Sequence, residues 1–239
     1  MIRSNLTTLV KLLLNIPNGK FTEMQENAIK KTPFAELLLG IVEAKLNLGY
    51  VMKSDRDALA LIRQYEGLGA RFKLGSKSVK LTAKEIALIF GIQSGATKIE
   101  LQQYPRVPDS PFALRLFPKK HDGPKILYVH VLAHFFEKAV KGEKVEDARD
   151  VARVLSLILI GTLFLPNSQA RVSWAYLDYI DDLERSTSYA WSTFITKKTI
   201  EALNKRFSTP ETNYGCVLGL MVNVFPCHIT LFAYEYKKI

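Results

Sequence analysis

The sequence EDARDVARVLSLILIGTLFL occupies residues 146–165, and it decides the fold class. Its first half mixes charged and apolar residues at helical spacing, and its second half is apolar nearly all round. A helix that is apolar on every side is buried among other elements. Its most apolar run, Val154–Pro166, is shorter than the roughly 20 residues of a membrane span. We therefore predict a long buried helix in a soluble, mainly helical protein.

Outside this stretch, helical spacing and start signals predict further helices. Thr82 and Glu85 form a capping box before one of them, and Gly91 ends it. The predicted helices cover Pro33–Leu46, Asp55–Tyr65, Ala83–Phe90, Ile126–Lys141, Ser173–Glu184, Tyr189–Phe207 and Tyr214–Tyr236. The fold class that we predict is mainly α: one compact multi-helix domain over residues 1–239, with one small β-hairpin.

The hairpin is predicted for residues 71–81, where apolar and basic residues alternate. Gly75 and Ser76 supply the turn between two short strands. Alternation places Phe72 and Leu74 on one face of the hairpin, with Val79 and Leu81 opposite them on the second strand. Arg71, Lys73 and Lys80 then share the other face. A basic face of this kind contacts phosphate or an acidic partner, or is simply a soluble outer surface.

The positive charge of the chain lies mostly in its first half. The protein has 239 residues and a formal net charge of +10. Residues 1–120 hold 19 Lys and Arg against 10 Asp and Glu, whereas residues 121–239 hold 14 against 13. Part of the excess lies in a basic loop, residues 93–124, which contains five prolines and reads as a long surface loop or an inserted arm.

The hairpin and this loop together form the predicted contact surface for a partner. Protein docking is the preferred hypothesis, and sequence-nonspecific binding of DNA or RNA through the same patch is the alternative. The candidate binding residues are Arg71, Lys73, Lys77, Lys80, Lys84, Lys98, Arg106, Arg115, Lys119 and Lys120.

Two groups of side chains suggest a metal site and hence a third hypothesis, an enzyme. His130 and His134 lie one helical turn apart, with Glu137 on the adjacent row, but the HExxH pattern of zinc enzymes is absent. The acids at 178, 181, 182 and 184 have a spacing that suits magnesium. We favour solvent-exposed or core histidines, and acids that pair with Arg171, Arg185 or a neighbouring helix start.

No catalytic motif or cofactor-binding loop is evident in the sequence, so we predict a non-enzymatic protein without a cofactor. Cys216 and Cys227 are the only cysteines, lie in an apolar segment and read as buried thiols in a reducing compartment. For the aromatic residues between Trp174 and Trp191 there are two hypotheses, stacking on nucleic-acid bases and packing in the core. Their helical spacing favours the core.

Six short segments stand in a recognisable order: Phe72–Gly95, Leu157–Pro166, Tyr179–Leu183, Tyr189–Trp191, Gly215–Cys216 and Phe232–Glu235. Taken in this order, they resemble the plant mobile domain family, also labelled "aminotransferase-like", and its relatives in plant transposable elements. The resemblance covers most of the chain, from about Pro33 to Glu235. It departs from the family near the end, where Leu231 and Phe232 stand in place of a tryptophan.

The resemblance implies a nuclear protein in transposon-related gene silencing and transcriptional regulation. It further implies a protein partner, a plant phosphoprotein phosphatase of the calcineurin-like superfamily. The aminotransferase label implies no chemistry, because no lysine stands in a phosphate-cradling site where pyridoxal phosphate would form its Schiff base.

Overall fold

The computed structural model describes residues 7–43, 62–74, 76–102, 109–117, 127–167 and 169–208. These residues are mainly helical, as predicted, with two small antiparallel sheets of two strands each. The predicted helix Tyr214–Tyr236, both cysteines and most of the predicted helix Asp55–Tyr65 lie outside the described residues. Among the residues that the structure describes, no helix has the length and apolar character needed to span a membrane.

The stretch that decides the fold forms the central helix. Helix α8 (Val145–Leu159) continues into a π-helical turn (Ile160–Phe164), and every residue from Asp150 to Phe164 is buried. The buried hydroxyls of Ser156 and Thr162 donate to carbonyls one turn back, at 2.8 and 2.7 Å, so the apolar surroundings leave neither unsatisfied. The prediction of a long buried helix is confirmed.

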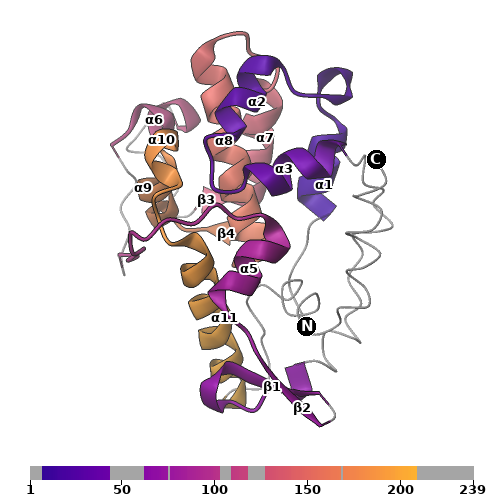
Figure 1. Ribbon diagram of the computed structural model, residues 1–239. Coiled ribbons are helices and arrows are strands. Elements are labelled where there is room, and N and C mark those ends of the chain that lie inside the picture. The colour runs from indigo at the N-terminus through magenta and orange to yellow at the C-terminus, as the bar shows by residue number, and fades with distance from the viewer. Residues whose placement is uncertain are drawn as a thin grey trace.

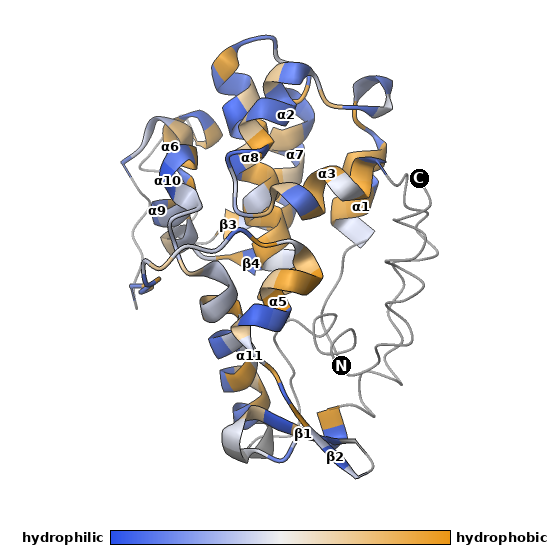
Figure 2. Cartoon of the chain, in the orientation of Figure 1, coloured by the Kyte–Doolittle hydropathy of each residue, from blue (hydrophilic) through white to orange (hydrophobic). Residues whose placement is uncertain are grey.

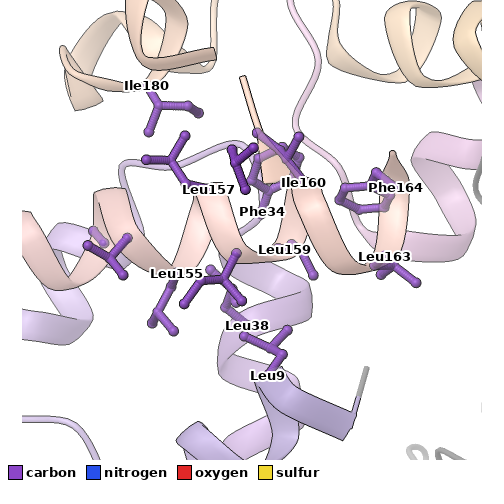
Figure 3. Close-up of a cluster of buried hydrophobic side chains, with 14 of the residues drawn as sticks. Leu9, Phe34, Leu38, Leu155, Leu157, Leu159, Ile160, Leu163, Phe164 and Ile180 are labelled. Carbon is purple, nitrogen blue, oxygen red and sulfur yellow. The ribbon is translucent and has the colours of Figure 1, made fainter. Parts of the chain in front are cut away.

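Helices from the N-terminal part of the chain and α7 cover α8. They are α1 (Thr7–Leu14), α2 (Glu23–Ile29), α3 (Ala35–Glu43) and α7 (Val129–Ala139), and Figure 1 shows them gathered around α8. In Figure 3, Leu9 of α1 and Leu38 of α3 approach the row of leucines on α8. Hydrophobic colour accordingly concentrates on α1, α3 and the second half of α8 in Figure 2.

The structure departs from the sequence prediction in helices α1 and α2, which were not predicted, in a second sheet and in a broken helix. Strands β3 (Leu127–Tyr128) and β4 (Arg171–Val172) pair where the helix Ile126–Lys141 was predicted to begin. The predicted helix Ser173–Glu184 divides into a 3-10 turn (Trp174–Tyr176), α9 (Leu177–Ile180) and α10 (Leu183–Ser186). The division has a local cause: Asp182 is extended, and its side chain accepts from the N–H of Arg185 and so begins a new helix.

The basic loop is not a free arm where the structure describes it. Helix α6 (Pro111–Leu116) lies in its middle, with Ser110 as N-cap and Pro111 at the first position. Phe112 is fully buried, and its ring meets that of Phe135 edge-on with centroids 5.9 Å apart. The middle of the predicted loop is therefore part of the core.

Helix α11 (Trp191–Ser208) connects the core to the hairpin. At its start, the segment after α5 (Ala83–Phe90) runs beside residues 188–190, and Thr97 pairs with Tyr189. Gly95 makes this approach possible, because a Cβ there would overlap the carbonyl oxygen of Ser188. Both tryptophans, Trp174 and Trp191, are fully buried in the core.

Candidate interaction surface

The predicted hairpin is present, with the predicted division of its faces. Strand β1 (Arg71–Leu74) pairs with β2 (Lys77–Lys80), and the register places Arg71 opposite Lys80 and Phe72 opposite Val79. Because paired residues share a face of a sheet, Arg71 and Lys80 lie on the same side as Lys73. We call this side the basic face: Arg71, Lys73, Ser78 and Lys80.

A third extended segment on the other edge of β1 adds an acid to this face. Tyr65 pairs with Phe72, and the N–H of Glu66 donates to the carbonyl of Arg71 at 2.9 Å. Glu66 therefore lies on the same side as Arg71, and its carboxylate accepts from the hydroxyl of Ser78 at 3.3 Å. One carboxylate thus joins three cations, and the basic face keeps a net positive charge.

The opposite side of the hairpin fixes it to the body of the protein. Phe72 is fully buried, and its ring packs on that of Tyr65 with centroids 5.1 Å apart. The hydroxyl of Tyr65 hydrogen-bonds Asn204 of α11 at 2.7 Å, and burial raises the pKa of this tyrosine. The basic face is consequently held in place from behind.

The cations of the hairpin region are exposed and unpaired with any described carboxylate. Arg71, Lys73, Lys77 and Lys80 are exposed, as is Lys84 in the first turn of α5. None of them forms an ion pair within the part of the chain that the structure describes. Their positive charge is available to a partner.

Of the remaining candidate residues, the two that the structure describes, Lys98 and Arg115, do not join this surface. Lys98 pairs with Glu100, and this contact raises the pKa of the lysine and lowers that of the glutamate. Arg115 lies on α6, which Figure 1 shows beside α9 and α10, well away from the hairpin. Arg106, Lys119 and Lys120 lie outside the described residues.

Arg115 belongs to an ion-pair network centred on α8. Its guanidinium donates to both carboxylate oxygens of Asp150, at 2.6 and 2.7 Å, and Arg153 donates to the same carboxylate at 2.7 Å. Asp150 and Arg153 are buried, so each needs the other's charge. The network also includes Lys31, Glu146, Arg149, Asp181 and Glu184.

The network has equal numbers of positive and negative groups, and the pKa shifts show how strongly they interact. Bidentate hydrogen bonds from Arg149, at 2.8 Å each, and one from Lys31 hold the pKa of Glu184 well below its usual range. Burial works to raise the pKa of Glu146, but Arg153 and Arg115 outweigh it and the pKa is lowered. The charges of this cluster cancel, so it connects neighbouring helices and has no net charge that would attract a ligand.

The groups considered for metal binding are not brought together. His130 and His134 are exposed on α7, and the nearest carboxylate to His134 is Glu137 at 4.0 Å. Of the four acids, Asp181 pairs with Arg153, Glu184 with Arg149, and Asp182 caps α10. Among the described residues, no group of three or more His, Cys, Asp or Glu has a metal-binding arrangement.

The basic end of α11 was not predicted from the sequence. Residues 191–208 hold Lys197, Lys198, Lys205 and Arg206 against one acid, Glu201. Asn204 contacts Tyr65 beneath the hairpin, so the exposed Lys205 lies at the hairpin end of the helix. A count over residues 121–239 concealed this cluster, because acids elsewhere in that half cancel its charge.

Together the fold and this surface define a class: a mainly helical domain that carries a small basic hairpin. The chain belongs to the family described as Domain of unknown function (DUF8566), which it matches over residues 2–221. No curated protein and no solved structure matches it.

The resemblance to the plant mobile domain family is therefore wrong. Those of its segments that the structure describes have structural tasks that many helical domains share: Gly95 permits a close backbone approach, and Trp191 and Phe164 both pack on Phe34. Capping residues and buried aromatics in such an order describe how helices pack, and they do not distinguish one helical family from another.

Proposed function

We propose that this protein is an interaction module that binds an acidic protein partner through the basic face of its hairpin. One observation carries the proposal: Arg71, Lys73 and Lys80 are exposed side by side without an ion pair to a described carboxylate. By contrast, Arg115 and Arg153 in the network around Asp150 are paired with a buried carboxylate. The nuclear and silencing roles and the phosphatase partner rested on the resemblance alone and are not part of the proposal.

A protein partner is preferred over nucleic acid because of what else lies on the face. Glu66 and Ser78 stand among the cations, so the surface offers a mixed pattern rather than a uniform stripe. A carboxylate at this position repels a phosphate backbone, whereas a protein partner can meet it with a donor. Nucleic-acid binding remains the second candidate, favoured by Lys84 and the basic end of α11.

The test compares two labelled probes, an oligoglutamate peptide and a random-sequence DNA duplex, by fluorescence anisotropy at two salt concentrations. We expect the peptide to bind, and the combined change Arg71→Glu, Lys73→Glu and Lys80→Glu to abolish binding. The matched control reverses Lys20, Lys138 and Lys141, which are exposed residues on other elements. It changes the net charge equally and should leave binding within about twofold.

Two results would contradict the proposal. Equal loss of binding in both triple variants would show that net charge alone attracts the peptide. Tight DNA binding with no peptide binding, and with log K falling by about 0.9 per phosphate contact for each log unit of salt, would favour the nucleic-acid alternative.

A further inference from the structure

We propose that the outer edge of β2 binds an extended segment of the partner as an added antiparallel strand, in which acidic and apolar residues alternate. The inference rests on the proposed function and names the shape and pattern of the partner at the same surface.

The hydrogen bonds fix which backbone groups of β2 point outward. Arg71 and Lys73 direct their backbone groups toward residues 64–66, since the carbonyl of Arg71 accepts from Glu66 and the N–H of Lys73 donates to Gln64. Backbone groups alternate along a strand, so those of Phe72 point the other way, to Val79. The N–H of Leu81 donates to the carbonyl of Ala70 at 3.2 Å, which continues the same alternation along β2.

It follows that Ser78 and Lys80 direct their N–H and C=O groups away from β1. No described residue pairs with them, and β2 is the edge of the sheet within the described part of the chain. An open edge of this kind is a template for another strand, which gains main-chain hydrogen bonds there.

The side chains of β2 determine the sequence pattern that the edge accepts. A residue placed opposite Lys80 or Ser78 lies on the basic face, beside Arg71 and Lys73, so a carboxylate is favoured there. A residue opposite Val79 lies on the other side, where Val79 is half-buried next to the fully buried Phe72. An apolar side chain at that position extends the covered surface.

The same charges exclude a second copy of this chain. Pairing β2 with β2 would bring Lys77 and Lys80 of both copies together, and like charges across strands oppose pairing. Lysine on an edge strand is a common protection against self-association. An acidic segment is attracted by the same lysines, so the edge discriminates by charge between an acidic partner and β2 of a second copy.

The experiment uses the full chain and three labelled peptides of alternating Glu and Val. The parent peptide is unmodified. One derivative is N-methylated on its Glu residues, which in an antiparallel strand face the edge with their N–H groups, and the other carries the same number of methyl groups on its Val residues. We expect methylation of Glu to weaken binding by at least about tenfold and methylation of Val to change it by less than about threefold.

A pair of variants tests the edge from the side of the protein. Ser78→Pro removes an outward N–H, a position where an edge strand tolerates proline, and should weaken binding of the parent peptide by about tenfold. Ser78→Ala also loses the hydroxyl but keeps the N–H, so it is the reference against which the effect of the proline is measured. Near-ultraviolet circular dichroism of both variants confirms that the fold is retained.

The outcomes separate this inference from the function on which it rests. If both methylated peptides bind like the parent while the basic-face triple variant binds none of them, strand addition is overturned and the docking function stands. Loss on methylation of Val rather than Glu overturns the antiparallel arrangement. If oligoglutamate and the parent peptide both fail to bind the unaltered chain, the proposed function itself is overturned.

Discussion

Single residues set limits on the backbone in this fold, and the first example is Gly95. The N–H of Gly95 donates to the carbonyl of Tyr189 at 2.9 Å, and no space remains for a side chain against Ser188. Gly95→Ala should destabilise the protein by about 1–3 kcal/mol, because either the strand-like contact or the start of α11 must move. Urea unfolding measures the change.

The neighbouring Ala96 is exposed and supplies the control for that experiment. Ala96→Ser should alter the free energy of unfolding by less than about 0.5 kcal/mol. A Gly95→Ala variant as stable as the Ala96→Ser variant would contradict the close approach.

The second example is Ala170, which has the left-handed conformation that favours glycine, with φ of 49°. Its side chain is exposed, so removal of the methyl group loses no packing. Ala170→Gly should stabilise the protein by about 0.5–1 kcal/mol, because relief of the backbone strain exceeds the added entropy of the unfolded chain. Ala70 also has a positive φ, of 57°, but is buried, so Ala70→Gly should gain less stability. Thermal unfolding of the two variants measures the difference.

At the scale of the element, the hairpin carries an unfavourable pair that its proposed function explains. Arg71 and Lys80 stand directly opposite each other, an arrangement that costs about 0.2–1 kcal/mol relative to neutral residues. Lys80→Glu should therefore raise the free energy of unfolding by about 0.5–1 kcal/mol while it weakens binding of oligoglutamate.

The opposite signs of these two effects make the prediction specific. Lys20→Glu, on an exposed residue outside the hairpin, should change neither quantity measurably. Loss of stability in the Lys80→Glu variant would show that the lysine supports the hairpin in a way that its register does not indicate.

Helix α8 depends on the buried carboxylate of Asp150. Its removal leaves Arg115 and Arg153 without their shared partner, and an uncompensated buried charge is strongly destabilising. Asp150→Ala should lower the free energy of unfolding by about 3–5 kcal/mol in urea denaturation. Glu143→Ala, on an exposed residue just before the helix, is the comparison and should cost less than about 0.5 kcal/mol.

The elements that the sequence predicts correctly are those whose signals are local. Thr82, Glu85 and Gly91 mark both ends of α5, and the structure places each in its predicted capping position. The start of α6 carries an equally local signal in Ser110 and Pro111, which a count of prolines obscured. Strand β3 has none: Leu127 pairs with Val172, which lies far along the chain, and such pairing depends on the assembled core.

At the scale of the whole molecule, the ion-pair network makes stability depend on pH. Glu184 and Glu146 have lowered pKa values in the folded protein, so they contribute stability that is complete above the pKa of an unfolded glutamate, about 4.3. That contribution is lost as the pH falls below this value. We expect the free energy of unfolding to decline between about pH 5 and pH 3.

Glu184→Gln should flatten this decline, because the variant no longer has a carboxylate to protonate at that position. Glu23→Gln is the control, since Glu23 is exposed in the first turn of α2 and forms no ion pair with a described residue. Equal slopes for the two variants in urea unfolding at several pH values would contradict a role for the Glu184 pairs.

The candidate surface could be predicted from the sequence only in part, because some of its features are local and others depend on contacts between distant segments. Alternation alone identifies Arg71, Lys73 and Lys80 as one face, because strand geometry is local. The place of Arg115 was not predictable, since its partners Glu146 and Asp150 lie on a helix that follows much later in the chain. Composition also does not show that Asn204, near the end of α11, hydrogen-bonds Tyr65 beneath the hairpin.

The two buried tryptophans give this protein an optical signal of folding that is independent of binding at the hairpin. Trp191 donates its indole N–H to the carbonyl of Ser186 at 2.9 Å, and it lies at the far end of α11 from Asn204 and the hairpin, about 20 Å along the helix axis. Trp174 is equally enclosed. Intrinsic emission should therefore respond to loss of the core and ignore a peptide at the hairpin, so that an anisotropy titration and an unfolding curve can be recorded on one sample without interference.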